Sequence, residues 1–171
     1  MRTAAAVIVA AFILFAWGGL VHGGPLGQMG MKPLPDDKAL MEAIKAQAPG
    51  NGTYFGPHGV LVVIHATPDM ADQTKAMGPM FMGEAIDDLV IAFVLVLLLV
   101  GAKPESTMGY ATTSGLMGVL ISLSSFVRFW IWYGVTPGFA ALDCINVIGG
   151  TFLAGLAIAL IMKGGKAKAA A

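Results

Sequence analysis

The chain has 171 residues, of which 57% are hydrophobic and only 12% are charged. Soluble domains carry about 25% charged residues, so this deficit, together with long apolar runs, places the chain in a lipid bilayer. Ten Lys and Arg residues balance ten Asp and Glu residues, which argues against a nucleic-acid-binding surface. The single cysteine, Cys144, excludes an internal disulfide, covalent c-type haem and a zinc ribbon.

The first apolar run predicts a transmembrane helix at 3–22, directly after Arg2. It approaches the length of about 20 residues that crosses a bilayer core of ~30 Å. Ala16-Trp17-Gly18 resembles a signal-peptidase site, so a cleaved signal peptide is the alternative. We expect an uncleaved signal anchor.

The segment 23–82 is polar enough to fold in water and predicts a small α+β extracytoplasmic domain. A unit of this size buries little apolar surface, and a lone hairpin is marginal in water, so the domain needs support from membrane helices or a partner. The elements expected along it are a helix capped by Asp36 and ended at 49–52, strands at 53–55 and 60–64, and a second helix begun at Thr67-Pro68 and stopped by Gly78-Pro79.

Three further apolar runs complete the predicted fold, a membrane all-α bundle of four transmembrane helices. The domain at 23–82 lies between the first two helices. The remaining segments are helices at 83–102, 108–134 and 138–162 and a basic tail at 163–171. Small residues on the last two helices allow close helix approach: Gly115, Gly118, Gly150 and Ala154.

Positive charges in the short connections predict the orientation. Arg2, Lys103 and the lysines of the tail lie on one side if there are four spans, and the positive-inside rule makes that side cytoplasmic. Both termini are therefore expected inside a multi-pass protein. Aromatic residues expected near the opposite interface agree with this orientation: Trp17, Trp130, Trp132 and Tyr133.

Polar residues inside the predicted spans are the main functional signal. Arg128 precedes the outer end of the third span, and Asp143 follows the start of the fourth, so a tight turn places both roughly 7 Å below the helix ends. Asp87, Asp88 and Asn146 are expected at comparable depth. Such residues are usually paired and buried between helices. The predicted intramembrane cluster fixes helix register as an ion pair, carries protons or ions, or contacts a lipid, a quinone or a partner subunit.

Methionines at the end of the outer segment suggest soft metal ligands. Met77, Met80 and Met82 have a spacing that suits Cu(I), and His65 would complete the site. The alternative is that these flexible side chains pack against lipid headgroups or a partner. All three histidines lie outside the cores of the spans, which argues against a transmembrane b-type haem.

No pattern in the sequence predicts an enzyme. The chain has no nucleophile elbow, no phosphate-binding loop and no dinucleotide-binding glycine motif after a strand. Cys144 lies in an apolar span, where an inert buried thiol is expected.

The first half resembles uncharacterised bacterial four-helix inner-membrane proteins with a small periplasmic domain after the first helix. The resemblance implies an anchored outer domain on a helical bundle in the bacterial inner membrane, and it assigns no activity. The residues that carry it are Trp17, His22, Asp37-Lys38-Ala39-Leu40, the run 43–49, the run 52–57 and Gly78-Pro79-Met80-Phe81.

Three functional hypotheses remain open from the sequence. The first is a non-catalytic accessory or assembly subunit of a larger respiratory or photosynthetic inner-membrane complex, with other membrane subunits and bound lipid as partners. Its basis is the undersized outer domain, the short loops elsewhere and the absence of a catalytic constellation. The second is a periplasm-facing copper-binding protein, and the third is a small transporter or channel that uses Arg128 and Asp143.

Overall fold

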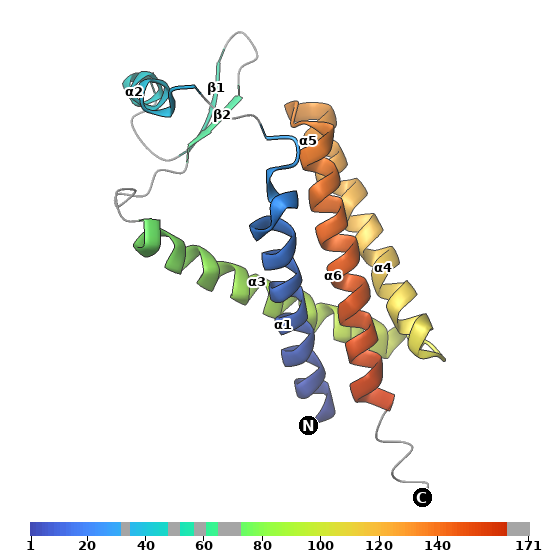
Figure 1. The fold of residues 1–171 in the computed structure, drawn as a ribbon. Coiled ribbons are helices and arrows are strands. Elements are labelled where there is room, and N and C mark those ends of the chain that lie inside the picture. The colour runs from blue at the N-terminus through green and yellow to red at the C-terminus, as the bar shows by residue number, and fades with distance from the viewer. Residues whose placement is uncertain (32–34, 48–51, 57–60, 65–72, 164–171) are drawn as a thin grey trace, which may run out of the picture. The chain divides into compact units, whose positions relative to one another are not determined.

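The chain is mostly helical (Figure 1). The computed structural model describes residues 1–31, 35–47, 52–56, 61–64 and 73–163. By contacts, the chain divides into two units, Met1–Met31 with Met82–Ala171 and Lys32–Phe81.

Within the described residues, four helical segments are long and apolar enough to cross a membrane, as the sequence predicts. The first is α1 (Arg2–Gly23), the second lies within α3 (Gln73–Ala102), and the last is α6 (Pro137–Lys163). In the larger unit these helices alternate in direction, and the start of α1 and the end of α6 lie at the same end of the bundle (Figure 1).

The third candidate span is broken into α4 (Thr107–Ser124) and α5 (Phe126–Tyr133). Ser125 separates them with φ −117° and ψ −79°. Immediately before the break, the Ser124 hydroxyl donates to the Ile121 carbonyl at 3.0 Å. Serine hydroxyls compete in this way with backbone hydrogen bonds, and serine pairs are a known cause of helix kinks. The continuous helix predicted for this span is therefore interrupted near its outer end.

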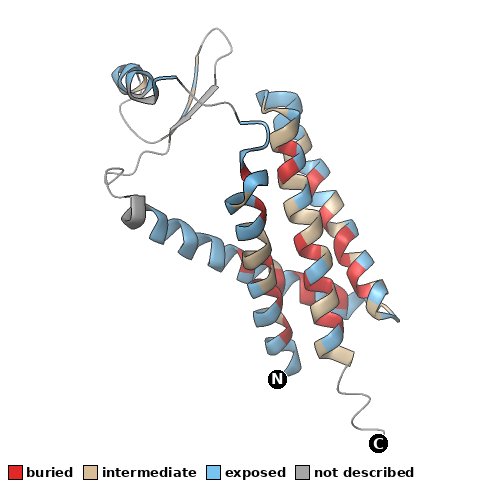
Figure 2. Cartoon of the chain, viewed as in Figure 1, coloured by how far each residue is buried: buried red, intermediate tan, exposed pale blue. Residues whose placement is uncertain are grey.

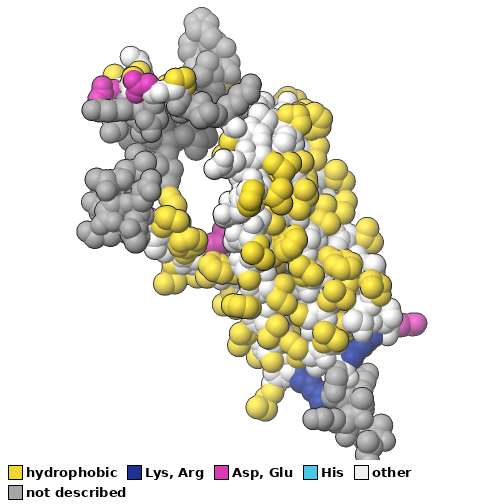
Figure 3. All heavy atoms as spheres, in the orientation of Figure 1, with side chains coloured by type: hydrophobic (Ala, Val, Ile, Leu, Met, Phe, Trp, Pro, Cys, Tyr) yellow, Lys and Arg dark blue, Asp and Glu magenta, His cyan; other side chains and the backbone are white. Residues whose placement is uncertain are grey.

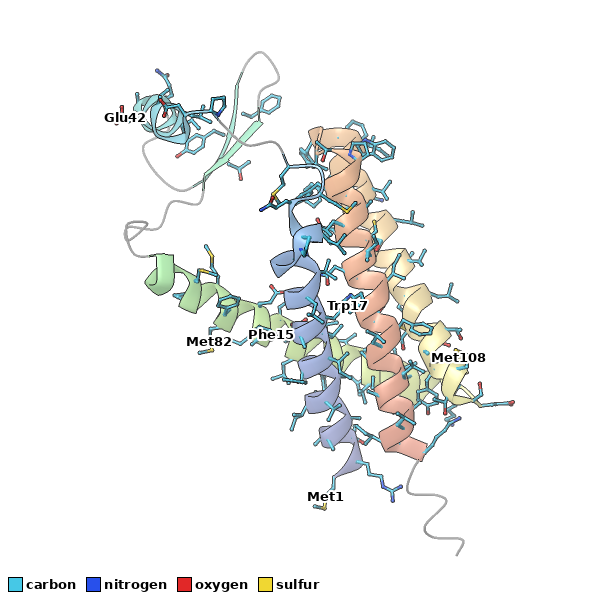
Figure 4. The ribbon with its side chains drawn as sticks, in the orientation of Figure 1. Met1, Phe15, Trp17, Glu42, Met82 and Met108 are labelled. Atoms are coloured by element: carbon cyan, nitrogen blue, oxygen red, sulfur yellow. The ribbon has the colours of Figure 1, made fainter. Side chains whose placement is uncertain are left out.

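The α1–α6 contact depends on an indole lying against two glycines. Trp17 points from α1 toward α6, and its Nε1–H donates to the Asn146 carbonyl at 3.0 Å (Figure 4). A methyl group added at Gly149 would lie 2.7 Å from Cζ2 of the indole, and one at Gly150 would lie 3.1 Å from Cδ1. The absence of a side chain at both positions therefore makes room for the ring.

The α4–α6 contact is equally close. A methyl group added at Gly155 would lie 2.8 Å from the Tyr110 carbonyl oxygen, and one at Gly118 would lie 2.9 Å from the Ile148 Cα. Small residues allow the two backbones to approach, which is the usual way membrane helices gain van der Waals contact. At the end of α6, Lys163 donates to the Glu105 carbonyl and lies over the ring of Tyr110.

The helix α3 packs over only part of its length. Ala92, Leu95, Val96 and Leu99 are buried in one cluster with residues of α1, α4 and α6. By contrast, residues 77–87 are all exposed. Figure 2 shows this difference as a red inner part and a pale blue outer part of α3.

The segment after α1 is attached to the start of α6. It contains the short 3-10 helix η1 (Pro25–Gln28) and then Gly30 at φ +76°, where a side chain would be strained. The Thr136 hydroxyl donates to the Gly30 carbonyl at 2.8 Å and accepts from the Phe139 amide at 3.2 Å. One hydroxyl therefore caps α6 and holds the segment that follows α1.

The smaller unit contains α2 (Asp37–Gln47) and the antiparallel strands β1 (Gly52–Phe55) and β2 (Leu61–Ile64), with Gly52 opposite Ile64. The predicted cap is confirmed, because the Asp36 carboxylate accepts from the Ala39 amide at 2.9 Å. The helix expected at Thr67-Pro68 lies outside the described residues. The predicted stop at Gly78-Pro79 is wrong, since α3 runs through Pro79 without interruption.

We expect Gly149→Ala to destabilise the bundle, because the added methyl group would overlap the indole of Trp17. Overpacking of this kind costs about 1–3 kcal/mol. The matched control is Gly19→Ala on α1, where nothing lies within 4 Å of the added methyl group. Thermal unfolding of both variants in detergent compares them, and equal midpoints would contradict the close α1–α6 contact.

Candidate functional site

One carboxyl group within the candidate spans is buried without a partner among the described residues. Asp88 is 7% exposed, and its Oδ2 has no hydrogen-bond donor. Its neighbour Asp87 is exposed. The sequence leaves open which of the two aspartates faces the bundle, and the structure assigns that position to Asp88. Unpaired buried carboxylates are costly, and they cluster at functional positions of membrane proteins.

Asp88 lines a cavity of about 290 Å³ inside the larger unit. Residues of α1, α3, α4, α5 and α6 all contribute to the wall. Acidic residues come from α3 alone, and the polar residues Asn146 and Thr151 come from α6. The remaining wall is mainly apolar: Leu14, Ile91, Ile121, Phe126, Val147 and Gly150.

The acidic wall contains a residue that sequence reasoning missed. Glu84 lies one helical turn before Asp87 and Asp88 and lines the same cavity. Residues at i, i+3 and i+4 share one side of a helix. The spacing of Glu84, Asp87 and Asp88 in the sequence therefore indicates that Glu84 lies on the same side of the helix as the two aspartates. Glu84 and Asp87 are exposed while Asp88 is buried, so the three carboxylates run from the surface into the cavity.

Asp143 has a different partner from the one predicted. Its Oδ1 lies 3.6 Å from Nε2 of His22, which follows the apolar body of α1. Arg128 is exposed on α5, and no ion pair joins it to Asp143. The expected cluster therefore separates into two groups: Asp87, Asp88 and Asn146 around one cavity, and Asp143 with His22 elsewhere.

A second cavity, of about 250 Å³, lies beside Asp143. Apart from this carboxylate its wall is apolar, and three phenylalanines dominate it: Phe126, Phe129 and Phe139. Phe126 thus lines both cavities, because it directly follows the break at Ser125.

The proposed copper ligands do not converge in the described residues. Met77, Met80 and Met82 are 47%, 52% and 65% exposed on α3, and Met82 projects outward (Figure 4). At about 100° per residue, Met82 lies on nearly the opposite side of the helix from Met80. His65 lies outside the described residues. No group of three or more His, Cys, Asp or Glu residues in the described chain is arranged to hold a metal ion.

Comparison of the chain with models of protein families, with curated proteins and with solved structures gave no match. The site therefore has to be interpreted from its own chemistry. Its distinctive feature is a buried carboxylate in a largely apolar cavity within the helix bundle.

We expect Asp88→Leu to stabilise the isolated protein, because the substitution removes a buried oxygen that has no donor. Leaving such a group unsatisfied costs about 1–3 kcal/mol. The matched control is Asp87→Leu, the same chemical change at the exposed neighbour. Unfolding midpoints in detergent measure both, and a lower midpoint for Asp88→Leu than for Asp87→Leu would mean that Asp88 stabilises the fold.

Proposed function

We propose that the chain is a non-catalytic accessory or assembly subunit of a larger membrane complex. The observation that carries the proposal is an exposed charge, Asp87, inside a candidate membrane span. It lies about 15 Å along α3 from Met77, at 1.5 Å per residue. A charge that faces lipid at such a position is costly, so in the membrane it is expected to be covered by protein.

Two further charged residues support this interpretation. Glu84 on α3 and Arg128 on α5 are also exposed within candidate spans, and no ion pair of the described residues includes either one. The long side chain of Arg128 can reach the interface from its position near the helix end, but the shorter Glu84 and Asp87 cannot extend as far. A partner helix with a cationic side chain at this depth would compensate the two carboxylates.

The helix surfaces around these charged residues also make few contacts with the rest of the chain. The outer part of α3 is exposed throughout 77–87, and none of the residues of α5 is buried. The outer part of α3 and the helix α5 therefore gain little stability from packing within their own chain. Contacts with another membrane protein would supply the missing packing.

The orientation in the bacterial inner membrane is part of the same proposal. Arg2, Lys103 and Lys163 occupy the end of the bundle where α1 starts, α3 meets α4, and α6 ends, and Figure 3 shows Lys and Arg side chains there. The positive-inside rule would make this end cytoplasmic and would place α2, β1 and β2 in a periplasmic domain.

The two alternatives receive less support from the geometry. The copper hypothesis needs Met80 and Met82 to bind one ion, and they lie on different sides of α3. The transport hypothesis began from Arg128 and Asp143, which form no ion pair with each other.

The proposal predicts that Asp87→Asn weakens association with a partner in native membranes. Loss of one member of a buried charge pair costs about 2–5 kcal/mol, so we expect at least ~10-fold less partner protein after gentle-detergent purification. Quantitative mass spectrometry of the co-purified proteins measures the change.

The control for this experiment is Glu105→Gln, which removes a carboxylate from the exposed turn between α3 and α4, outside the candidate spans. It should leave the amount of partner unchanged. Purification of the wild-type chain without a stoichiometric membrane-protein partner would refute the subunit proposal. So would equal recovery of the partner with Asp87→Asn and with wild type.

A further inference from the structure

The cavity at Asp88 contains a buried carboxyl oxygen that no donor of the described residues satisfies. Asp88 is more than nine-tenths buried, and its Oδ2 has no donor, although His22 on α1 pairs with another aspartate, Asp143. Buried charges in membrane proteins are normally paired. A cation or a hydrogen-bond donor would satisfy the Asp88 carboxyl.

The wall of the cavity indicates which kind of cation fits. Apart from its carboxylates, the amide of Asn146 and Thr151, the lining is mainly aliphatic, with one aromatic ring, Phe126. The Thr151 hydroxyl already donates to the Val147 carbonyl at 2.8 Å. Asp88 can bind an ammonium group, and the apolar wall can bury a hydrocarbon body. Phe126 also lines the cavity, and aromatic rings attract cations through their faces.

The size of the cavity agrees with a small organic ligand. A single water needs only about 10–15 Å³ of such volume, whereas sites for small molecules begin near 300 Å³. The cavity of about 290 Å³ lies close to that lower limit.

An inorganic cation is a poorer match to the same cavity. Ca²⁺ prefers six to eight oxygen ligands, and Mg²⁺ prefers an octahedral shell. No group of three or more His, Cys, Asp or Glu residues in the described part of the chain can hold a metal ion. Beyond the carboxylates, side-chain oxygen atoms come to this wall only from Asn146 and Thr151, and the other lining residues are apolar.

We propose that this cavity is a binding site for a small organic monocation, an ammonium ion attached to a compact apolar or aromatic body. Asp88, the buried carboxyl of the wall, pairs with the ammonium group. The site goes beyond the subunit function and does not depend on it, because it rests on the buried Asp88 and not on the exposed Asp87.

Calorimetry on the full chain in nanodiscs tests the site, with benzylammonium as probe and benzyl alcohol as its uncharged counterpart. We expect saturable binding of benzylammonium and none of benzyl alcohol. Asp88→Asn should weaken binding at least ~10-fold, the effect of losing about 1.4 kcal/mol of interaction. Asp88→Glu, which keeps the charge, should retain binding.

Glu105→Gln is the matched control, because it removes one carboxylate outside the cavity and should leave the affinity unchanged. Equal affinity of wild type and Asp88→Asn, equal binding of the two probes, or no binding of benzylammonium would each overturn the proposal. Tighter binding of sodium than of benzylammonium would overturn the assignment of the site to an organic cation. The assay uses the isolated chain and Asp88, so its failure is separate from a failure of the partner assay at Asp87.

Discussion

The close approach of α1 and α4 to α6 is the constraint on which the rest of the bundle depends. The Trp17 indole lies against Gly149 and Gly150, and Gly155 and Gly118 bring α4 near the backbone of α6. In a bilayer the hydrophobic effect gives helices little reason to associate, so this packing and the Trp17–Asn146 hydrogen bond have to hold them together. α6 can therefore be described as the central helix of the unit.

The candidate site lies where this packing ends. The inner part of α3 joins the apolar cluster through Ala92, Leu95, Val96 and Leu99, but the outer part has no such contacts. Asp88 lies at the transition, one turn before the packed region begins. The break at Ser125 contributes as well, because it sets the direction of α5 and places Phe126 at the cavity wall. Incomplete packing and a broken helix together leave space around a carboxylate.

The sequence predicts the four candidate spans, the cap at Asp36 and the charged residues within those spans, because each depends on local composition or spacing. It does not predict which side of α3 faces the bundle. Apolar side chains lie on every side of this helix, so no amphipathic stripe distinguishes Asp87 from Asp88. It also assigns Asp143 the wrong partner. Arg128 is near in sequence, but the pairing with His22 requires α1 to pack against α6, a tertiary contact that short-range spacing does not reveal.

The contrast between Asp143 and Asp88 supports a ligand-binding role for Asp88 rather than a structural one. Asp143 contributes to the fold through His22, so its charge has a partner within the chain. No residue in the described part of the chain pairs with Asp88, and its neighbours Glu84 and Asp87 on α3 are acidic too. A carboxylate in this position lowers the stability of the isolated chain, because its unpaired oxygen is removed from water. Proteins accept such a cost mainly at sites where another molecule compensates the charge.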